Sequence, residues 1–335
     1  MRRKFIKAID IALAKLLRFS PVRGQQLFVY AFHGVLPDLD ILGQNLTDPY
    51  QPITLRDIER VIVRLKESGV SFVTGREIAA QAVRYPAAWL TFDDGYANNL
   101  QLLPLLRRLD VPATIFVATG NVESGEAYWW DVLFREGMQR GKNMPDIARQ
   151  REEMKSLPPQ KIRQQLIDMF GAESLRPKAD IDRPLTPGEL CSLAKEPLIE
   201  IGNHTHNHCI LTLGDGACRR REISACNAYL QKITGSLPVS IAYPNGDFDQ
   251  QILKITESLG LKVGVTCLPF RNRAGSTQKP PDSLRLGRFA GLRSDKLERE
   301  LSLSLAPVGL AQSLAERMSK RTPYQTETQC TPKRE

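Results

Sequence analysis

The chain has 335 residues, of which 42% are hydrophobic and 25% charged, enough for one large globular domain or two small ones with a buried core. Its net charge of +9 favours acidic partners such as phospholipid headgroups or anionic polymers, and no known nucleic-acid-binding motif accompanies it, so a nucleic-acid partner is not expected. The six cysteines form no CxxC pair, which argues against a zinc finger or a disulfide framework and for a reducing compartment.

The N-terminal segment, residues 1–24, starts with basic residues but lacks the uninterrupted apolar run of a signal peptide. Apolar residues recur there at helical spacing, with lysines and arginines between them, which predicts a basic amphipathic helix. Through residues 1–19 this helix would either contact an anionic membrane or dock on its own domain. Together with the unpaired cysteines, the pattern predicts a cytoplasmic protein associated with the inner face of the cytoplasmic membrane.

Strands and helices are expected to alternate over residues 25–305. The alternation predicts an α/β fold with a parallel sheet, and the polar residues that end several strands favour a barrel with a chemically active face. Residues 131–185 are polar, with a helical pattern and no strand pattern, which predicts a helical insertion. Residues 306–335 lose all periodicity and are predicted to form a disordered tail. The apolar runs that predict strands are 25–35, 71–74, 87–96, 111–119, 197–204, 239–246 and 261–267.

Three of the four histidines fall within five positions of the stretch IEIGNHTHNHCIL, at His204, His206 and His208. His204 and His208 are four residues apart, so both imidazoles share one face if the chain turns helical there. Two histidines and one carboxylate form a catalytic site for a Zn-like divalent ion, with coordination left open for water and substrate. The alternative is a structural pair bonded to the backbone. His206 is expected to point elsewhere.

Two adjacent carboxylates, Asp93 and Asp94, end an apolar strand in the stretch TFDDGY. Such a pair is electrostatically unfavourable unless a cation or a shared proton offsets the charge. A division of roles follows, in which one carboxylate binds a metal and the other acts as general base on water. The alternative for the pair alone is an aspartate turn that caps a helix, and the downstream histidines favour the metal site.

The stretches TFDDGY, HTHNH and AYPNG resemble the first three motifs of the NodB-homology polysaccharide deacetylases, carbohydrate esterase family 4. The stretch YAFHGV resembles a strand of the exopolysaccharide-biosynthesis branch of that family. The resemblance covers roughly residues 27–290 and implies a distorted (β/α)7 barrel, here with the helical insertion. It also implies a metal-dependent hydrolase that removes acetyl groups from N-acetylated sugars. The enzyme would use one divalent ion, for which Zn²⁺ is expected and Co²⁺, Ni²⁺ and Mn²⁺ are the alternatives.

Carried over residue by residue, the resemblance makes Asp94, His204 and His208 the metal ligands and Asp93 the general base. The family usually supplies its general acid as a histidine near the C-terminal end, and this chain has no histidine after position 208. His33 ends a predicted strand, where a barrel places it on the catalytic face, so we predict that His33 is the acid.

The third motif, AYPNG, implies an oxyanion contact from the backbone N–H near Asn245, with Tyr243 and Pro244 in the pocket wall. Many family members have an arginine in this motif that orients the base carboxylate, whereas this chain has Ala242. One of two arginines in the stretch SLRLGRF, either Arg285 or Arg288, is predicted to replace it.

Other functions stay open from the sequence alone. A non-catalytic carbohydrate-binding barrel would share the fold, although it has no chemical need for both carboxylates and both histidines. An O-deacetylase or another amidase would use the same metal site. The expected partner is an N-acetylated glycan or a lipid-linked sugar of surface polysaccharide biosynthesis. The paired Trp129 and Trp130 either stack on sugar rings or anchor the insertion.

Overall fold

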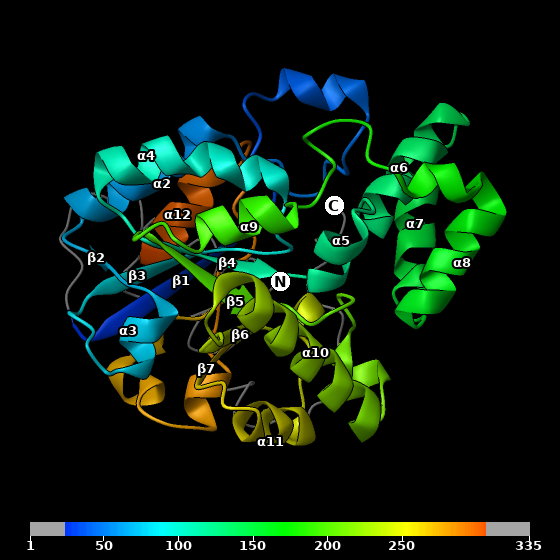
Figure 1. Ribbon diagram of the computed structural model, residues 1–335. Coiled ribbons are helices and arrows are strands. Elements are labelled where there is room, and N and C mark those ends of the chain that lie inside the picture. The colour runs from blue at the N-terminus through cyan, green and yellow to red at the C-terminus, as the bar shows by residue number, and fades with distance from the viewer. Residues whose placement is uncertain (1–23, 306–335) are drawn as a thin grey trace, which may run out of the picture.

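The computed structural model describes residues 24–305 (Figure 1). Residues 1–23 of the predicted N-terminal helix lie outside this range, and so does its predicted membrane contact. The tail predicted for residues 306–335 also lies outside it. The strands are β1 (Gln26–Phe32), β2 (Ser71–Phe72), β3 (Ala87–Phe92), β4 (Ala113–Val117), β5 (Ile199–Asn203), β6 (Ser240–Ala242), β7 (Val263–Val265) and β8 (Asn272–Arg273).

Helices follow most of the strands. Thr54 caps the first of them, α2, with a capping box formed by Thr54 and Asp57. Within residues 24–305, no helix is long and apolar enough to cross a membrane. The helices are α2 (Leu55–Glu67), α3 (Gly75–Ala79), α4 (Leu102–Leu109), α5 (Thr119–Ser124), α6 (Trp129–Gln139), α7 (Met144–Met154), α8 (Pro159–Phe170), α9 (Pro187–Leu193), α10 (Gly216–Thr234), α11 (Gln250–Ser258) and α12 (Leu297–Leu305).

The strands form one curled sheet in the order β7-β6-β5-β4-β3-β1-β8, with β2 paired to β3 beside this path. All these pairs are parallel except β1 with β8. In the register of β1 and β3, Leu27 lies opposite Ala87 and Phe32 opposite Phe92. The two strands therefore end level, and the polar residues that follow them meet at one edge of the sheet.

The two ends of the sheet are joined by residues 286–289, which we call the closing segment. Leu286 bridges to Val265 of β7, and Phe289 bridges to Tyr30 of β1, both in parallel. Backbone hydrogen bonds of 2.8–3.1 Å support both bridges. The sheet therefore curls into a distorted barrel, with the closing segment as the last of its parallel chain paths.

Alternation along the strands divides the core into an inner and an outer layer. Inside the barrel lie Leu27 and Val29 of β1 with Trp89 of β3, in a cluster that also holds side chains from β4, β6 and β7. Outside, Phe28 and Tyr30 belong to a larger cluster that the strands share with α2, α4, α9, α10 and α12. Most strand residues are buried on both faces, which is why their sequences read as continuous apolar runs.

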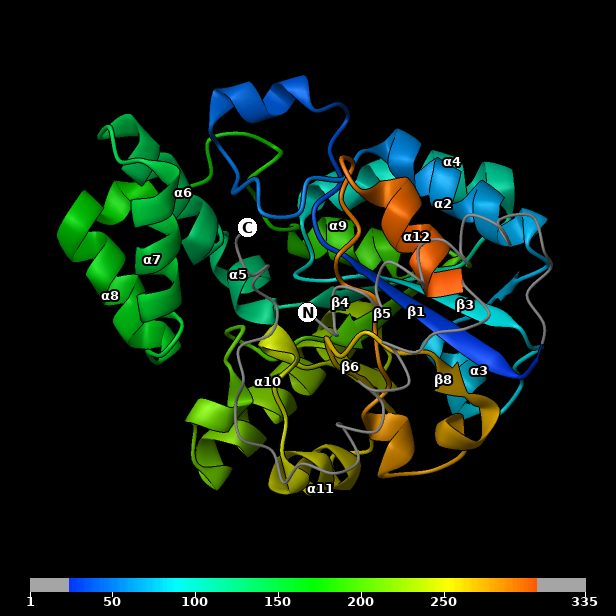
Figure 2. The same ribbon diagram turned by 180° about the vertical axis from the view of Figure 1, so that it is seen from behind.

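Helices α6, α7 and α8 lie beside the barrel and not against its sheet (Figures 1 and 2). We call them the insertion. They pack around their own apolar core, which includes Leu133, Ile147 and Leu166. A buried ion pair between Arg135 of α6 and Asp182 fastens the chain that leads back to the barrel. The insertion is thus a second, smaller core joined to the first.

Candidate active site

The residues predicted to carry chemistry gather at the carboxyl ends of the parallel strands. Asp93 and Asp94 follow β3, His204 follows β5, His33 follows β1, and Arg288 lies in the closing segment. All five line one cavity of about 570 Å³, which the insertion borders on its far side. A volume of this size is typical of a small-molecule site, and the carboxyl ends of strands are where barrels carry their active sites.

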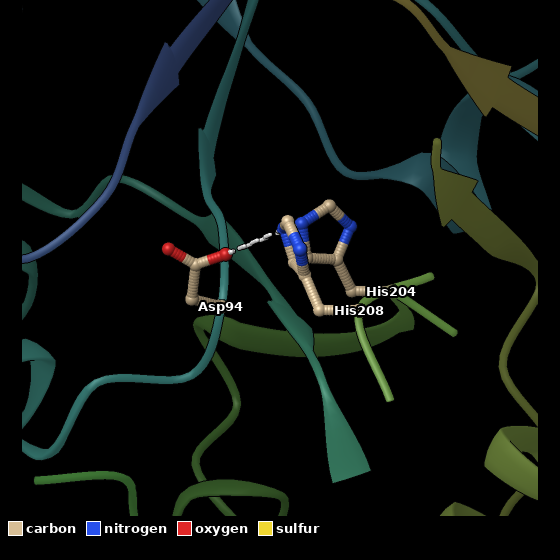
Figure 3. Close-up of side chains that lie close together, drawn as sticks. All are labelled: Asp94, His204 and His208. Carbon is tan, nitrogen blue, oxygen red and sulfur yellow. Dashed lines mark ion pairs between the residues drawn. The ribbon is translucent and has the colours of Figure 1, made fainter. Parts of the chain in front are cut away.

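Asp94, His204 and His208 point toward one another (Figure 3). Oδ1 of Asp94 lies 3.3 Å from Nε2 of His204 and 3.3 Å from Nε2 of His208. In a tetrahedral site with Zn–N and Zn–O bonds of about 2.1 Å, neighbouring ligand atoms are about 3.4 Å apart. The three side chains, which we call the ligand triad, therefore fit a Zn-like ion. No other three His, Cys, Asp or Glu side chains converge in this way between residues 24 and 305.

A left-handed turn brings the second carboxylate into the cavity. Successive side chains of a strand point to opposite faces, so Asp93 and Asp94 would separate if β3 simply continued. Instead Asp94 has φ 75° and Gly95 has φ 86°, a conformation that residues other than glycine seldom adopt. A Cβ on Gly95 would also lie 3.0 Å from the Val117 side chain. The glycine of TFDDGY thus permits the turn that brings Asp94 to the two histidines.

Asp94 is buried and yet ionised. Burial raises the pKa of a carboxyl, but the imidazoles of His204 and His208 hold the pKa of Asp94 well below its ordinary value. The carboxylate therefore offers a charged oxygen to a cation at any physiological pH.

The barrel holds His204 from behind. Its Nδ1 lies 2.7 Å from the carbonyl oxygen of Ala242, which requires the proton on Nδ1 and leaves Nε2 free as a ligand atom. The next residue, Thr205, has φ 61°, which is rare for a β-branched side chain. Its Oγ1 accepts a hydrogen bond from the Cys209 N–H at 3.0 Å, which closes the loop that carries both histidines.

His208 lies on the outer side of the ligand triad. Its side chain is 19% exposed, against 2% for His204, and its own backbone is left-handed, with φ 50°. The ring of Trp130, in the first turn of α6, lies 4.8 Å from the His208 ring between centroids. His206 points elsewhere, as expected, with Nδ1 2.9 Å from Oγ1 of Thr119.

Arg288 and Asp93 form a buried ion pair at the base of the cavity. Nη1 of Arg288 lies 2.7 Å from Oδ1 of Asp93, and both side chains are at most 4% exposed. Nε of Arg288 donates to the Thr266 carbonyl at 2.9 Å, which fixes the guanidinium. Burial alone would raise the pKa of Asp93, but Arg288, followed by His204, holds it below its ordinary value. Of the two arginines predicted to contact the base carboxylate, Arg288 does so.

Three residues predicted for the site lie away from the cavity wall. Arg285 donates to the Asp282 carboxylate and does not line the cavity. Ala242 faces the barrel interior, so strand alternation turns Tyr243 outward, where its hydroxyl donates to the Leu284 carbonyl at 2.9 Å. Pro244 is buried and does not line the cavity either. The pocket wall predicted for Tyr243 and Pro244 is therefore built by other residues.

Asn245 is the residue of the third motif that lines the cavity. It has φ 60°, and its side-chain amide donates to Asp247 at 2.8 Å. The neighbouring N–H of Gly246 is engaged by the Tyr243 carbonyl at 2.8 Å, whereas the N–H of Asn245 donates to none of the residues that the structure describes. A backbone donor is therefore available at this edge of the cavity.

His33 lies level with Asp93 across the β1–β3 register. Its Nδ1 is buried and has no hydrogen-bond partner within the described part of the chain. The imidazole is close enough to Asp93 and Asp94 to help lower the pKa of each carboxyl. The residue as a whole is half-buried and lines the cavity, so its imidazole meets the cavity beside the two carboxylates.

Sequence reasoning gave no catalytic role to the aromatic residues beside the ligand triad. Nε1 of Trp130 donates to the Tyr96 hydroxyl at 2.8 Å, and this hydroxyl donates to the buried Asp131 at 2.6 Å. The sequence signal was the aromatic cluster YWWD at the start of the insertion, which does not reveal its partner across the cavity.

Comparison with known proteins agrees with this geometry. The family model described as "Polysaccharide deacetylase" matches residues 80–264, which include both aspartates, the histidine cluster and the third motif. A search of the curated proteins found no match.

Solved structures of deacetylases share the fold. The Streptococcus pyogenes deacetylase PplD in complex with acetate has a TM-score of 0.55 and 18% identity, over 85% of this chain and 100% of that chain. IcaB from Ammonifex degensii has a TM-score of 0.54 and 17% identity, over 86% and 100%. The BpsB deacetylase domain from Bordetella bronchiseptica has a TM-score of 0.52 and 17% identity, over 80% and 97%. The predicted distorted barrel is confirmed.

Proposed function

Because the chain belongs to the polysaccharide deacetylase family and is a hydrolase of that family, we propose that it removes N-acetyl groups from a glycan or a lipid-linked sugar in surface polysaccharide biosynthesis. The observation that carries this proposal is the ligand triad beside the Asp93–Arg288 pair in one cavity. Hydrolysis of an acetamide needs an electrophile at the carbonyl, a base for water and an acid for the leaving amine, and the cavity offers a group for each.

The ligand triad would hold one divalent ion, which is Zn²⁺ by the chemistry of two imidazole nitrogens and one carboxylate oxygen. Such an ion, when bound, polarises a carbonyl oxygen and lowers the pKa of water. The chain prepares two of the three ligands in advance. The Ala242 carbonyl sets the tautomer of His204, and the turn at Gly95 aims Asp94.

Asp93 would take the proton from the attacking water. Arg288 engages its Oδ1, keeps the carboxyl ionised and fixes its orientation, which leaves Oδ2 to face the cavity. A base held in place within a closed pocket contributes about 10²–10⁴-fold to the rate.

Asn245 and His33 would serve the oxyanion and the leaving group. The N–H of Asn245 has no competing acceptor in the described chain, so it can donate to the oxygen that gains charge as water attacks. His33 would protonate the amine as the C–N bond breaks, since its half-buried imidazole lines the same cavity. His206 is less suited to this step, because its Nδ1 pairs with Thr119 and its Nε2 faces Glu123 at 3.5 Å.

The far wall of the cavity suits a sugar. It combines the aromatic side chains of Trp129 and Tyr50 with the polar groups of Gln160 and Arg163. Sugar rings present apolar faces and a rim of hydroxyl groups, so aromatic and hydrogen-bonding side chains together match their chemistry.

The location that we propose is the cytoplasm, at the inner face of the membrane. Five cysteines within residues 24–305 are unpaired thiols, which suits a reducing compartment, and the net charge of +9 suits an anionic lipid surface. Separation of cells into soluble, membrane and secreted fractions tests this, and recovery in the secreted fraction would contradict it.

The experiment that tests the function is acetate release from matched sugars by the Zn²⁺-loaded full chain. Oligosaccharides of N-acetylglucosamine and their O-acetylated counterparts are supplied side by side, with Asp93→Asn as the inactive control. We expect acetate from the N-acetylated set and about 10²–10⁴-fold less from the variant. Release from the O-acetylated set alone would assign the site to ester hydrolysis.

A further inference from the structure

The two histidines of the ligand triad are oriented by different means. His204 donates from Nδ1 to a backbone carbonyl at 2.7 Å. For His208, the polar side-chain contact that residues 24–305 provide is at Nε2, with Asp94, and the ring otherwise lies against Trp130 with 4.8 Å between centroids and 60° between planes. Metal-binding histidines usually owe their ring orientation to a contact at the second nitrogen. His208 therefore depends on its packing.

A chain of hydrogen bonds fixes Trp130. Its Nε1 donates to the Tyr96 hydroxyl at 2.8 Å, which donates to Oδ2 of Asp131 at 2.6 Å. The other carboxylate oxygen of Asp131 accepts from Oγ1 of Thr47 at 2.9 Å and from the backbone N–H of Asp48 at 2.7 Å. Tyr96 and Asp131 are buried, so each link is shielded from water.

Two further rings contact the Trp130 ring. The His208 ring is tilted against it, and the Tyr128 ring stacks on it at 5.1 Å with 16° between planes. Tyr128 also donates from its hydroxyl to the Asp94 carbonyl at 2.9 Å, so the same aromatic cluster reaches two members of the ligand triad. Both tryptophans line the cavity, but the ring contact with His208 is made by Trp130 and not by Trp129.

We propose that Trp130 is a positioning residue for the metal, whose ring orients the His208 imidazole and is itself held by Tyr96 and Asp131. The inference rests on the proposed metal centre and adds that the first turn of α6 belongs to it. The insertion then does more than cover substrate, because the metal site is complete only when α6 is docked. Binding of the ion should in turn stabilise the docked insertion, since the coupling is reciprocal.

The test is metal affinity, measured by competition of the full chain with a chromophoric Zn²⁺ chelator. We expect Trp130→Leu to bind Zn²⁺ about 10–100-fold more weakly than wild type, the usual effect of removing a group that orients a ligand. Trp130→Phe keeps a ring against His208 and should recover most of the affinity. Trp129→Leu is the matched control, and its Zn²⁺ affinity should equal that of wild type.

Thermal unfolding of each metal-free variant separates positioning from simple anchoring. If Trp130 only anchors the insertion, Trp130→Leu lowers Tm and leaves Zn²⁺ affinity unchanged, and that result would overturn the inference. If Trp130→Leu fails to fold, Tyr96→Phe is the substitute, because it removes the hydrogen bonds that hold Trp130 and keeps the Trp130 ring. Unchanged Zn²⁺ affinity in Tyr96→Phe would also overturn the inference. Wild type that binds no Zn²⁺ would instead refute the proposed function.

Discussion

The barrel and the insertion border one cavity but are held together in different ways. The barrel aligns its functional groups through strand register: Asp93 follows β3 level with the end of β1, and strand alternation sends its side chain inward. The insertion has a separate apolar core and reaches the cavity through side-chain contacts, chiefly Trp130 on His208 and Asp131 on Tyr96. The backbone therefore sets one half of the site, and tertiary packing sets the other.

The difference predicts which changes abolish chemistry and which alter the assembly of the site. Changes to the groups at strand ends should abolish chemistry and leave the path of the sheet backbone unchanged, because strand register sets their positions. Changes in the insertion should act at a distance, through docking of α6 against His208.

The largest effect is expected at Asp93, on the barrel side. Asp93→Asn removes the base while keeping the shape, so kcat for acetate release should fall about 10²–10⁴-fold. The ligand triad is untouched, and Zn²⁺ content per chain should stay that of wild type. Loss of metal together with activity would mean that Asp93 is a ligand and not the base.

Arg288→Met tests the buried pair that orients this base. The variant leaves Asp93 at most 4% exposed and without its cation, so the free energy of unfolding should fall by about 3–5 kcal/mol. Urea unfolding measures this. The double variant with Asp93→Asn should be more stable than Arg288→Met alone, because it removes the unpaired charge, and the reverse order would contradict the pairing.

Leu166→Ala opens a cavity in the core of the insertion, where Leu166 is 1% exposed. We expect a local loss of about 2–4 kcal/mol. Hydrogen exchange should show lost protection in α6, α7 and α8 while the strands keep theirs, if the two cores are separately stable. Equal loss in the strands would show that barrel and insertion unfold as one unit.

Asp131 gives the insertion a pH dependence. Burial raises the pKa of Asp131 from its ordinary value of 3.8 to about 7, although the hydrogen bond from Tyr96 acts to lower this pKa. Between these pH values the folded chain keeps a proton that the unfolded chain has lost, so this stabilisation is complete below about pH 4 and is lost as pH rises through about 7. From about pH 5 to pH 8, wild type should lose about 2 kcal/mol relative to Asp131→Asn.

Thermal unfolding of both proteins across this pH range provides the measurement. Asp48 is the charged neighbour of Asp131 and pairs with Arg151 in both proteins, so the titration of Asp48 cancels to first order in the comparison. Parallel profiles for the two proteins would contradict the raised pKa.

The smallest effect is expected for an arginine on the barrel surface. Arg108 pairs with Glu59 between α4 and α2 at 3.0 Å, with side chains 57% and 39% exposed. Arg108→Ala should change the free energy of unfolding by no more than about 0.5 kcal/mol. Beside Arg288→Met, it shows how much the effect of an arginine pair depends on burial.

Sequence reasoning succeeded where local pattern determines position. The pattern of residues at strand ends predicted a site of two histidines and one of two adjacent carboxylates, and the resemblance to the deacetylases assigned that carboxylate to Asp94. The choice between Arg285 and Arg288 was beyond reach, because the closing segment joins the sheet only through isolated bridges and has no strand pattern of its own. The outward position of Tyr243 could have been predicted from strand alternation, because Ala242 faces inward and its neighbour must then face outward.

The contact of Trp130 with His208 joins residues far apart in the chain. No periodicity within the insertion indicates which face of α6 meets the barrel, since that depends on how two separate cores dock. The sequence therefore left open whether the paired tryptophans of YWWD contact a sugar or anchor the insertion. The structure shows that Trp130 contacts His208 of the ligand triad.

The most direct test of the account is the metal content of the purified full chain, with wild type, His208→Ala and His206→Ala measured side by side after loading with Zn²⁺. The account predicts about one ion per chain in wild type and in His206→Ala, which leaves the ligand triad intact, and loss of that ion in His208→Ala. No bound metal in wild type, or equal metal in all three proteins, would contradict it.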